Sequence, residues 1–375
     1  MKKILCLVTA VFFMLMTAFP ARAEKIKECS VVFELTSGVI IDSSGENDVV
    51  SIGTMNKLMT VLLAAEKIES GKLSLNTIVK ASENANSMQG AQIWLMPGES
   101  ISVEELLKGI IIGNANDASV AIAEAVSGSE QKFVVRMNER AAELGMFDTS
   151  FTNCCGYYDD NKQLSTAADL SKLICELYKH EFLKPYFTTW LDYVRDGAAE
   201  LVNSNVLVKN FDGIIGFKAG FTENAGNFTA AAAKRDDKAF GVIILGAQDK
   251  DEMFLRAKNK LNSVFADYIV IKPDLPEKIP ICAAVRGALT DEVPIKVGSV
   301  RNIVIPKGAA DSITSKAILP DYVYAPVNED DKIGEIAFYR KDKYLFSVDI
   351  TASESVKEKT VGDVLLKLLK FMFSF

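Results

Sequence analysis

The stretch "GTMNKLMTVLLAAEKIESGKL", residues 53–73, decides how the rest of the chain is interpreted. Its apolar residues recur at helical spacing, and the pattern ends at a glycine; they are Met55, Leu58, Met59, Leu62, Leu63 and Ile68. The pattern predicts a helix with Thr54 at its start and Lys57 three positions on. Side chains three apart lie on the same face of a helix. A hydroxyl and an amine are therefore expected one turn apart, which suits a nucleophile and its base.

The first 23 residues have the pattern of a removable signal peptide. They combine the basic start "MKK", the apolar run "ILCLVTAVFFMLMTAF" and the small-residue site "ARA" ending at Ala23. A transmembrane anchor is the alternative, but the run is short for that and ends at Pro20. We therefore expect export, with the mature protein at the outer face of the cytoplasmic membrane.

Charge and cysteine content exclude several classes of protein. The formal net charge is −7, and the only charged residues of the signal segment are the basic Lys2, Lys3 and Arg22, so the mature chain is still more acidic. An acidic chain without a basic stripe argues against nucleic acid as a partner. Five scattered cysteines remain after removal of the signal segment, with no CxxC pair. This pattern predicts neither a disulfide framework nor a zinc site, and we expect no metal or cofactor.

The chain has one histidine, His180, in the stretch "ELYKHEFLKPYF". We expect it at the surface near a helix end. No nucleophile elbow lies near it, so a Ser-His-Asp or Cys-His mechanism has no support. A hydrolase built on this chain would need a lysine as its base.

The order of elements predicts an α+β domain over residues 24–270. A hairpin is expected over 29–42, followed by several helices, then by consecutive strands from residue 205 and a closing helix. A proline-rich linker is expected over 271–280. Short β-type segments over 281–355 then predict a small all-β domain.

The C-terminal stretch 359–375 predicts an amphipathic helix. One stripe is polar, formed by Asp363, Lys367, Lys370 and Ser374, and the remainder is largely apolar. The helix is too short to cross a bilayer, for which about 20 residues are needed. We expect it to lie in the membrane interface. Docking on its own β-domain is the alternative.

Three segments, "TMNK" at 54–57, "NAN" at 114–116 and "KAG" at 218–220, define a family resemblance. Their order, spacing and surroundings resemble the low-molecular-mass penicillin-binding proteins that act as D-alanyl-D-alanine carboxypeptidases, which carry SxxK, SxN and KTG. The resemblance implies a β-lactamase/transpeptidase-like domain with an antiparallel sheet and helices. It also implies the small all-β domain and the terminal amphipathic helix that follow.

The resemblance also implies roles for individual residues. Lys57 would be the general base, Asn116 would hold the substrate amide and Lys218 would bind the substrate carboxylate. Ala219 and Gly220 complete the third motif. The backbone N–H groups of the nucleophile and of Phe221 would form the oxyanion hole.

Three departures from the family pattern affect positions to which the resemblance assigns a chemical role. Thr54 replaces the nucleophilic serine, and its extra methyl group restricts χ1. Asn114 replaces a proton-relaying serine, and an amide cannot relay a proton. Ala219 replaces a threonine, which removes a hydrogen bond to a charged group worth roughly 1.5–3 kcal/mol.

The sequence therefore predicts a carboxypeptidase that removes the terminal D-alanine of peptidoglycan stem pentapeptides through an acyl-enzyme, slowed by these changes. β-Lactams are expected as further ligands. The alternative is a non-catalytic relative that binds stem peptides or acts as a cell-wall scaffold. A glycan-cleaving enzyme using Asp159 and Asp160 is a third class, but adjacent acids in "YYDD" are typical of a solvated turn.

Overall fold

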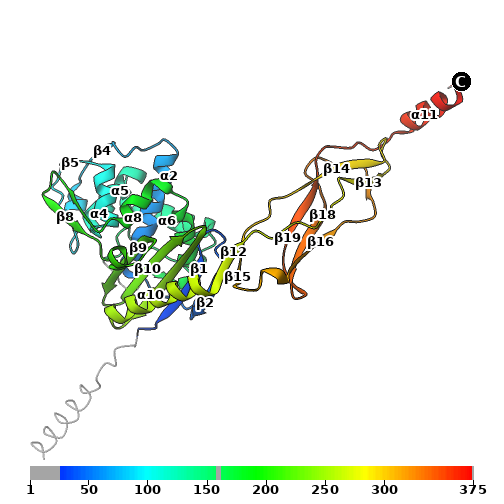
Figure 1. Ribbon diagram of the computed structural model, residues 1–375. Helices are drawn as coiled ribbons and strands as arrows, with labels where there is room; N and C mark the ends of the chain where they lie inside the picture. The colour runs from blue at the N-terminus through cyan, green and yellow to red at the C-terminus, as the bar shows by residue number, and fades with distance from the viewer. Residues whose placement is uncertain (1–25, 158–161, 374–375) are drawn as a thin grey trace, which may run out of the picture.

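The computed structural model describes residues 26–157 and 162–373 of the 375-residue chain. Its N-terminal part is built on a five-stranded antiparallel sheet with helices on both faces (Figure 1). In spatial order the strands are β2 (Ile40–Ser44), β1 (Cys29–Glu34), β11 (Lys238–Ala247), β10 (Gly226–Arg235) and β9 (Ile214–Thr222). The predicted α+β class with an antiparallel sheet is confirmed.

The sheet separates two hydrophobic cores because its side chains alternate between faces. Val31 and Phe33 of β1 point into the core under the larger helical region, whereas Val32 points to the other face. There α10 (Lys250–Asp267) covers the sheet with Phe254 and Leu261. The predicted strands around residues 214–247 and the helix after them are observed.

The larger helical region follows β2 in the chain and contains most of the remaining helices. They are η1 (Gly53–Asn56), α2 (Lys57–Glu69), α3 (Glu83–Asn86), α4 (Val103–Ile111), α5 (Asn116–Ser127), α6 (Glu130–Glu143), α7 (Ala167–Tyr178), η2 (Glu181–Leu183) and α8 (Lys184–Thr188). The short helix α9 (Leu207–Asn210) instead packs with Leu207 in the core beneath α10. The first nine residues of α2 are all buried. This helix is therefore the centre of the region, as its apolar pattern predicted.

Three two-stranded ribbons border the helical region. They pair β3 (Val50–Ser51) with β6 (Leu164–Ser165), β4 (Ile78–Lys80) with β5 (Ser100–Ser102), and β7 (Leu191–Val194) with β8 (Ala199–Val202). The β7–β8 hairpin was not expected from the sequence. Its turn places Arg195 against Glu99, with Nε 2.6 Å from the carboxylate, so it is fixed to the segment before α4.

A further ribbon joins the two parts of the chain. β12 (Tyr268–Ile271) pairs with β15 (Ile303–Pro306), which comes from the C-terminal part. Val270 and Val304 pack on the core beneath α10, whereas Ile303 and Ile305 belong to a core of the β-rich part. The connection is thus a paired ribbon in addition to the proline-rich segment. The boundaries expected at 270, 280 and 355 remain predictions.

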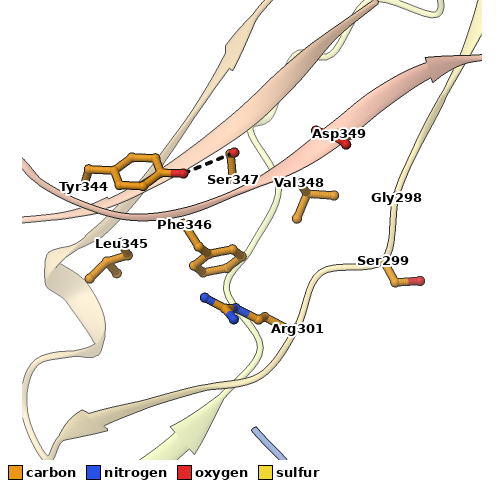
Figure 2. A pocket seen from close by; sticks show the side chains of 9 residues that line it. All are labelled: Gly298, Ser299, Arg301, Tyr344, Leu345, Phe346, Ser347, Val348 and Asp349. Carbon is orange, nitrogen blue, oxygen red and sulfur yellow. Dashed lines mark hydrogen bonds between the residues drawn. The ribbon is translucent and has the colours of Figure 1, made fainter. Parts of the chain in front are cut away.

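The C-terminal part contains a six-stranded sheet, which agrees with the expected small all-β domain. The strands are β13 (Cys282–Arg286), β14 (Glu292–Val297), β16 (Ile313–Ile318), β17 (Val323–Tyr324), β18 (Lys332–Arg340) and β19 (Lys343–Ala352), with η3 (Ala310–Ser312) before β16. A groove of about 610 Å³ runs along β19 (Figure 2). Arg301 lies over the Phe346 ring there, 4.7 Å from its centre. This groove contains none of the residues predicted to carry chemistry.

The terminal helix α11 (Val361–Phe373) lies at the far end of the all-β part (Figure 1). Thr360 and Asp363 cap its start through reciprocal hydrogen bonds. Its apolar side chains are exposed, among them Val361, Leu365 and Met372. None of the α11 side chains that the structure describes belongs to a hydrophobic core of the all-β part, so these side chains show no docking there. Within residues 26–157 and 162–373, no helix is both long and apolar enough to cross a bilayer.

Further expectations from the sequence concern the single histidine, the signal peptide, the acidic pair at 159–160 and the cysteines. The expectation for His180 was wrong, because it is buried, with Nδ1 2.9 Å from Glu69 Oε2. The predicted signal peptide and the pair Asp159 and Asp160 lie outside the described residues. All five cysteines after the signal segment are free thiols.

Gly216 provides a test of how β9 is held. Its φ is +99°, and an added Cβ would stand 2.0 Å from the carbonyl oxygen of Phe187. We expect Gly216→Ala to lower the free energy of unfolding by about 3 kcal/mol, because backbone strain and a backbone clash combine. Urea unfolding followed by circular dichroism measures the loss.

Gly197→Ala is the matched control for that substitution. Gly197 has φ +88° with no atom within 4 Å of an added Cβ, so only the conformational cost of about 1 kcal/mol applies. Equal losses in the two variants would show that the Phe187 contact does not constrain β9.

Candidate active site

The amine of Lys57 is the centre of the site. The residue is 1% exposed at the first position of α2. Its Nζ donates to Asn116 Oδ1 at 2.7 Å and to the carbonyl oxygen of Cys155 at 2.6 Å. A buried amine is tolerated only when it is hydrogen-bonded. The start of α5 and the loop at residue 155 therefore hold the lysine in place.

Burial lowers the pKa of Lys57 to about 8, from an ordinary value of 10.5. The nearby thiols of Cys155 and Cys154 and the Asp117 carboxylate act in the opposite direction, but more weakly. An appreciable fraction of the amine is thus neutral near pH 8. A neutral amine can accept a proton, so Lys57 has the property that a general base requires.

Three successive carbonyls, of residues 153–155, receive hydrogen bonds from the start of α2. Asn56 Nδ2 donates to residue 153 at 2.9 Å, Thr60 Oγ1 to residue 154 at 2.7 Å, and Lys57 to residue 155. Gly156 allows this contact, because a Cβ there would stand 2.2 Å from the Gly53 carbonyl oxygen. The loop therefore fits the helix start closely.

The two cysteines of this loop are buried and differ in acidity. A hydrogen bond from the Cys154 thiol lowers the pKa of the Cys155 thiol to about 7, and the charge of Lys57 acts in the same direction. Burial raises the pKa of Cys154 well above its ordinary value. Sequence reasoning did not identify this loop, because backbone carbonyl acceptors have no residue signature.

Lys218 brings a second amine into the site from β9. It is 3% exposed, and its Nζ donates to Asn114 Oδ1 in the loop between α4 and α5. Burial lowers the pKa of Lys218 well below 10.5, and the charge of Lys57 lowers it further. Asn114 adopts φ +58°, a conformation that asparagine tolerates better than most residues.

Thr54 lies in η1, directly before α2, and next to β9. It is 5% exposed, and its Oγ1 has no hydrogen-bond partner among the described residues. A Cβ on Gly220 would stand 3.2 Å from that oxygen, so β9 passes the hydroxyl closely. In this structure the Thr54 hydroxyl therefore forms no hydrogen bond with Lys57. Catalytic hydrogen bonds are often made only when substrate is bound.

The remaining predicted residues occupy different environments. Asn116 is buried, and its Nδ2 donates to the carbonyl of Gln89 at 2.5 Å. Ala219 packs in the core beneath α10, on the face of β9 opposite Lys218, and borders a cavity of about 110 Å³. Phe221 is 62% exposed. β9 is the edge strand, so the backbone of Gly220 and Phe221 has one side free of any neighbouring strand of the sheet.

Neither buried lysine forms an ion pair with a carboxylate among the described residues. Their acceptors are neutral oxygens from Asn116, Cys155 and Asn114. When both amines are protonated, no carboxylate among the described residues balances their charge, which favours the entry of an anion. The described residues contain no cluster of three His, Cys, Asp or Glu side chains suited to a metal ion.

Comparison with solved structures identifies the class of protein. Penicillin-binding protein 5 from Haemophilus influenzae superposes with a TM-score of 0.81 at 22% identity, over 90% of this chain and 100% of that one. Penicillin-binding protein D2 from Listeria monocytogenes, solved in an ampicillin-bound form, gives 0.56 at 25% identity, over 63% and 95%. The fold is that of the low-molecular-mass penicillin-binding proteins, as the sequence predicted.

Sequence comparison then identifies the family. The family described as D-alanyl-D-alanine carboxypeptidase matches residues 17–249, and the C-terminal domain of penicillin-binding protein 5 matches residues 283–358. Carboxypeptidase DacF of Bacillus subtilis is 32% identical, covering 89% of each chain. DacC of Escherichia coli is 25% identical, over 88% of this chain and 84% of that protein. The chain belongs to the D-alanyl-D-alanine carboxypeptidase family.

A substitution of Lys218 tests whether burial of its charged amine lowers the free energy of unfolding. Its burial without a carboxylate opposes folding, so we expect Lys218→Met to raise the free energy of unfolding by about 1–2 kcal/mol at pH 7. Because the pKa is lowered in the folded state, the penalty applies at low pH and fades as pH rises toward 10.5. Urea unfolding at several pH values measures the gain.

Lys234→Met is the control, because Lys234 is an exposed lysine on the neighbouring strand β10. It should leave stability nearly unchanged. A Lys218→Met protein that is less stable than the wild type at pH 7 would show that the amine is well compensated in the folded state.

Proposed function

We propose that this protein removes the terminal D-alanine from peptidoglycan stem pentapeptides through an acyl-enzyme on Thr54. The observation that carries the proposal is the pair of buried lysines with no carboxylate partner among the described residues, together with the unpaired hydroxyl of Thr54. A peptide with a free C-terminus brings one carboxylate into reach of Lys218 and one scissile carbonyl into reach of Thr54. Membership of the carboxypeptidase family supports this assignment.

In the proposed reaction the substrate lies along the open edge of β9. Backbone hydrogen bonds to an edge strand bind extended peptides in this way. Lys57 takes the proton of Thr54 Oγ1 as that oxygen attacks the carbonyl carbon. Backbone N–H groups of Thr54 and Phe221 stabilise the oxyanion. D-Alanine leaves after accepting a proton, and water then releases the shortened peptide.

Two residues account for the slow turnover that we propose. The γ-methyl group of Thr54 limits the rotation of its hydroxyl toward Lys57. Asn114 still accepts a hydrogen bond from Lys218 but cannot pass on a proton. We propose that the same residues capture β-lactams covalently, because the strained amide and carboxylate of these compounds imitate the peptide end.

We also propose that α11 holds the exported protein at the outer surface of the cytoplasmic membrane. Its apolar side chains are exposed, and helices of this kind bind the membrane interface. Its position beyond the all-β part (Figure 1) leaves the site-bearing domain at a distance from the lipid.

Thr54→Ser tests the nucleophile. We expect the substitution to raise D-alanine release from a pentapeptide ending in D-Ala-D-Ala by roughly a hundredfold, because a misplaced reacting group costs about that factor. The wild type should form an adduct with a labelled β-lactam that peptide mass spectrometry assigns to Thr54. Thr54→Val, which keeps the shape and loses the hydroxyl, is the control and should give neither product.

The opposite outcome would distinguish a non-catalytic binding protein from an enzyme. No adduct and no D-alanine release from wild type and Thr54→Ser alike would contradict the catalytic proposal. Saturable peptide binding that is weakened by Lys218→Ala would then assign the site to non-catalytic recognition.

The pH dependence of turnover tests Lys57 as the base. Because the reactive form is the neutral amine, kcat/KM should rise about tenfold per pH unit below the pKa and level off above about 8. D-Alanine release at constant ionic strength from pH 6 to 10 measures the profile. A rise that continues to pH 10 would indicate a lysine of ordinary basicity and contradict the assignment.

A further inference from the structure

Trp94 is an exposed aromatic residue on a strained backbone. Its side chain is 62% exposed, and its φ is +57°, in the left-handed region that bulky residues avoid. Single exposed apolar residues need no explanation. Phe147, for example, is 83% exposed, without a positive φ. The combination of exposure and backbone strain at Trp94 is what points to a function.

The residues on both sides of Trp94 are fixed by one buried carboxylate. Asp117, in the first turn of α5, accepts hydrogen bonds from the N–H groups of Ile93 at 3.1 Å and Leu95 at 3.0 Å. The side chains of Ile93 and Leu95 are buried. The chain is thus anchored immediately before and after the tryptophan, and Trp94 itself is left at the surface.

The carbonyl groups of the same two neighbours are also bound. Arg195 donates to the carbonyl of Ile93 at 2.9 Å, and Asn86 Nδ2 donates to that of Leu95 at 2.7 Å. Arg195 is itself held by both oxygens of Glu99. All four backbone groups that flank Trp94 are therefore paired with side chains from other segments, and the ring is presented on a rigid support.

This support adjoins the active site. The carbonyl of Ala91 accepts a hydrogen bond from the backbone N–H of Asn116 at 2.7 Å, and the side-chain amide oxygen of Asn116 binds Lys57. Trp94 follows Ala91 by three residues, which limits their Cα separation to about 10 Å. A substrate that reaches Lys57 along β9 extends beyond it by several residues. The exposed ring is thus within reach of the part of a substrate that is remote from the scissile bond.

We propose that Trp94 is a stacking platform for a pyranose ring of the glycan strand to which a stem peptide is attached. This inference rests on the proposed function and names a further part of its substrate. Four residues separate the scissile bond from the sugar and span at most about 14 Å. The C–H face of a pyranose is flat and apolar, so it matches a rigid exposed indole. The protein would then prefer stem peptides on glycan over free peptides.

The test compares a free pentapeptide ending in D-Ala-D-Ala with the same peptide on N-acetylglucosaminyl-N-acetylmuramic acid. Calorimetry with the full mature chain should give about tenfold tighter binding of the glycan-linked form. Trp94→Gly should abolish this difference while leaving the affinity for free pentapeptide unchanged. Glycine accepts a positive φ, so this variant is expected to fold. Trp94→Phe should keep most of the preference, and Phe147→Ala all of it.

A second measurement separates this inference from the proposed function. The chain has two tryptophans, so Trp190→Phe leaves Trp94 as the only tryptophan fluorophore. Peptide-free oligosaccharides of the same two sugars should shift its emission saturably even if no peptide is hydrolysed. An unchanged emission, or a glycan preference that survives Trp94→Gly, would overturn the inference. Failure of D-alanine release alone would count only against the catalytic proposal.

Discussion

The structure depends on the burial of one ammonium group, that of Lys57. Its two acceptors, Asn116 Oδ1 and the carbonyl of Cys155, come from segments 59 and 98 residues away in the chain. Both oxygens are neutral, so they reduce the cost of burial without cancelling the charge. The start of α2, the start of α5 and the 153–156 loop must therefore be in register for the fold to accept this lysine. The geometry of the site and the packing of the domain therefore depend on the same contacts.

The second buried lysine, Lys218, is subject to a similar constraint. Lys218 sits on an edge strand, against the amide oxygen of Asn114, so it too is held by a neutral acceptor. A carboxylate in either place would have neutralised the site and closed it to anions. Amide and carbonyl acceptors instead fix the amines without adding a negative charge to the site. This arrangement supports our proposal that the ligand carries a terminal carboxylate, as a peptide end does.

Much of this arrangement could be predicted from sequence, and the remainder has identifiable physical reasons. Apolar periodicity predicted α2, and β-rich runs predicted β9 to β11. The β12–β15 ribbon was missed because its strands are short and their pairing is non-local. The carbonyls of residues 153–155 were missed because every residue has a carbonyl. The side-chain alternation of β9 also changes near Phe217, whose φ is +91°, so a strict period of two misplaces its faces.

The three departures from the family pattern differ in what they change. Ala219 faces the core beneath α10 rather than the lysines, so its missing hydroxyl leaves the Lys57 and Lys218 contacts intact. Asn114 keeps Lys218 in position, so the amine that we propose as the carboxylate-binding group stays in place. Thr54 keeps its hydroxyl beside β9, but the oxygen is not bonded to its base. We therefore attribute the slow turnover that we propose to proton transfer at Thr54 and Asn114, rather than to a loss of substrate recognition.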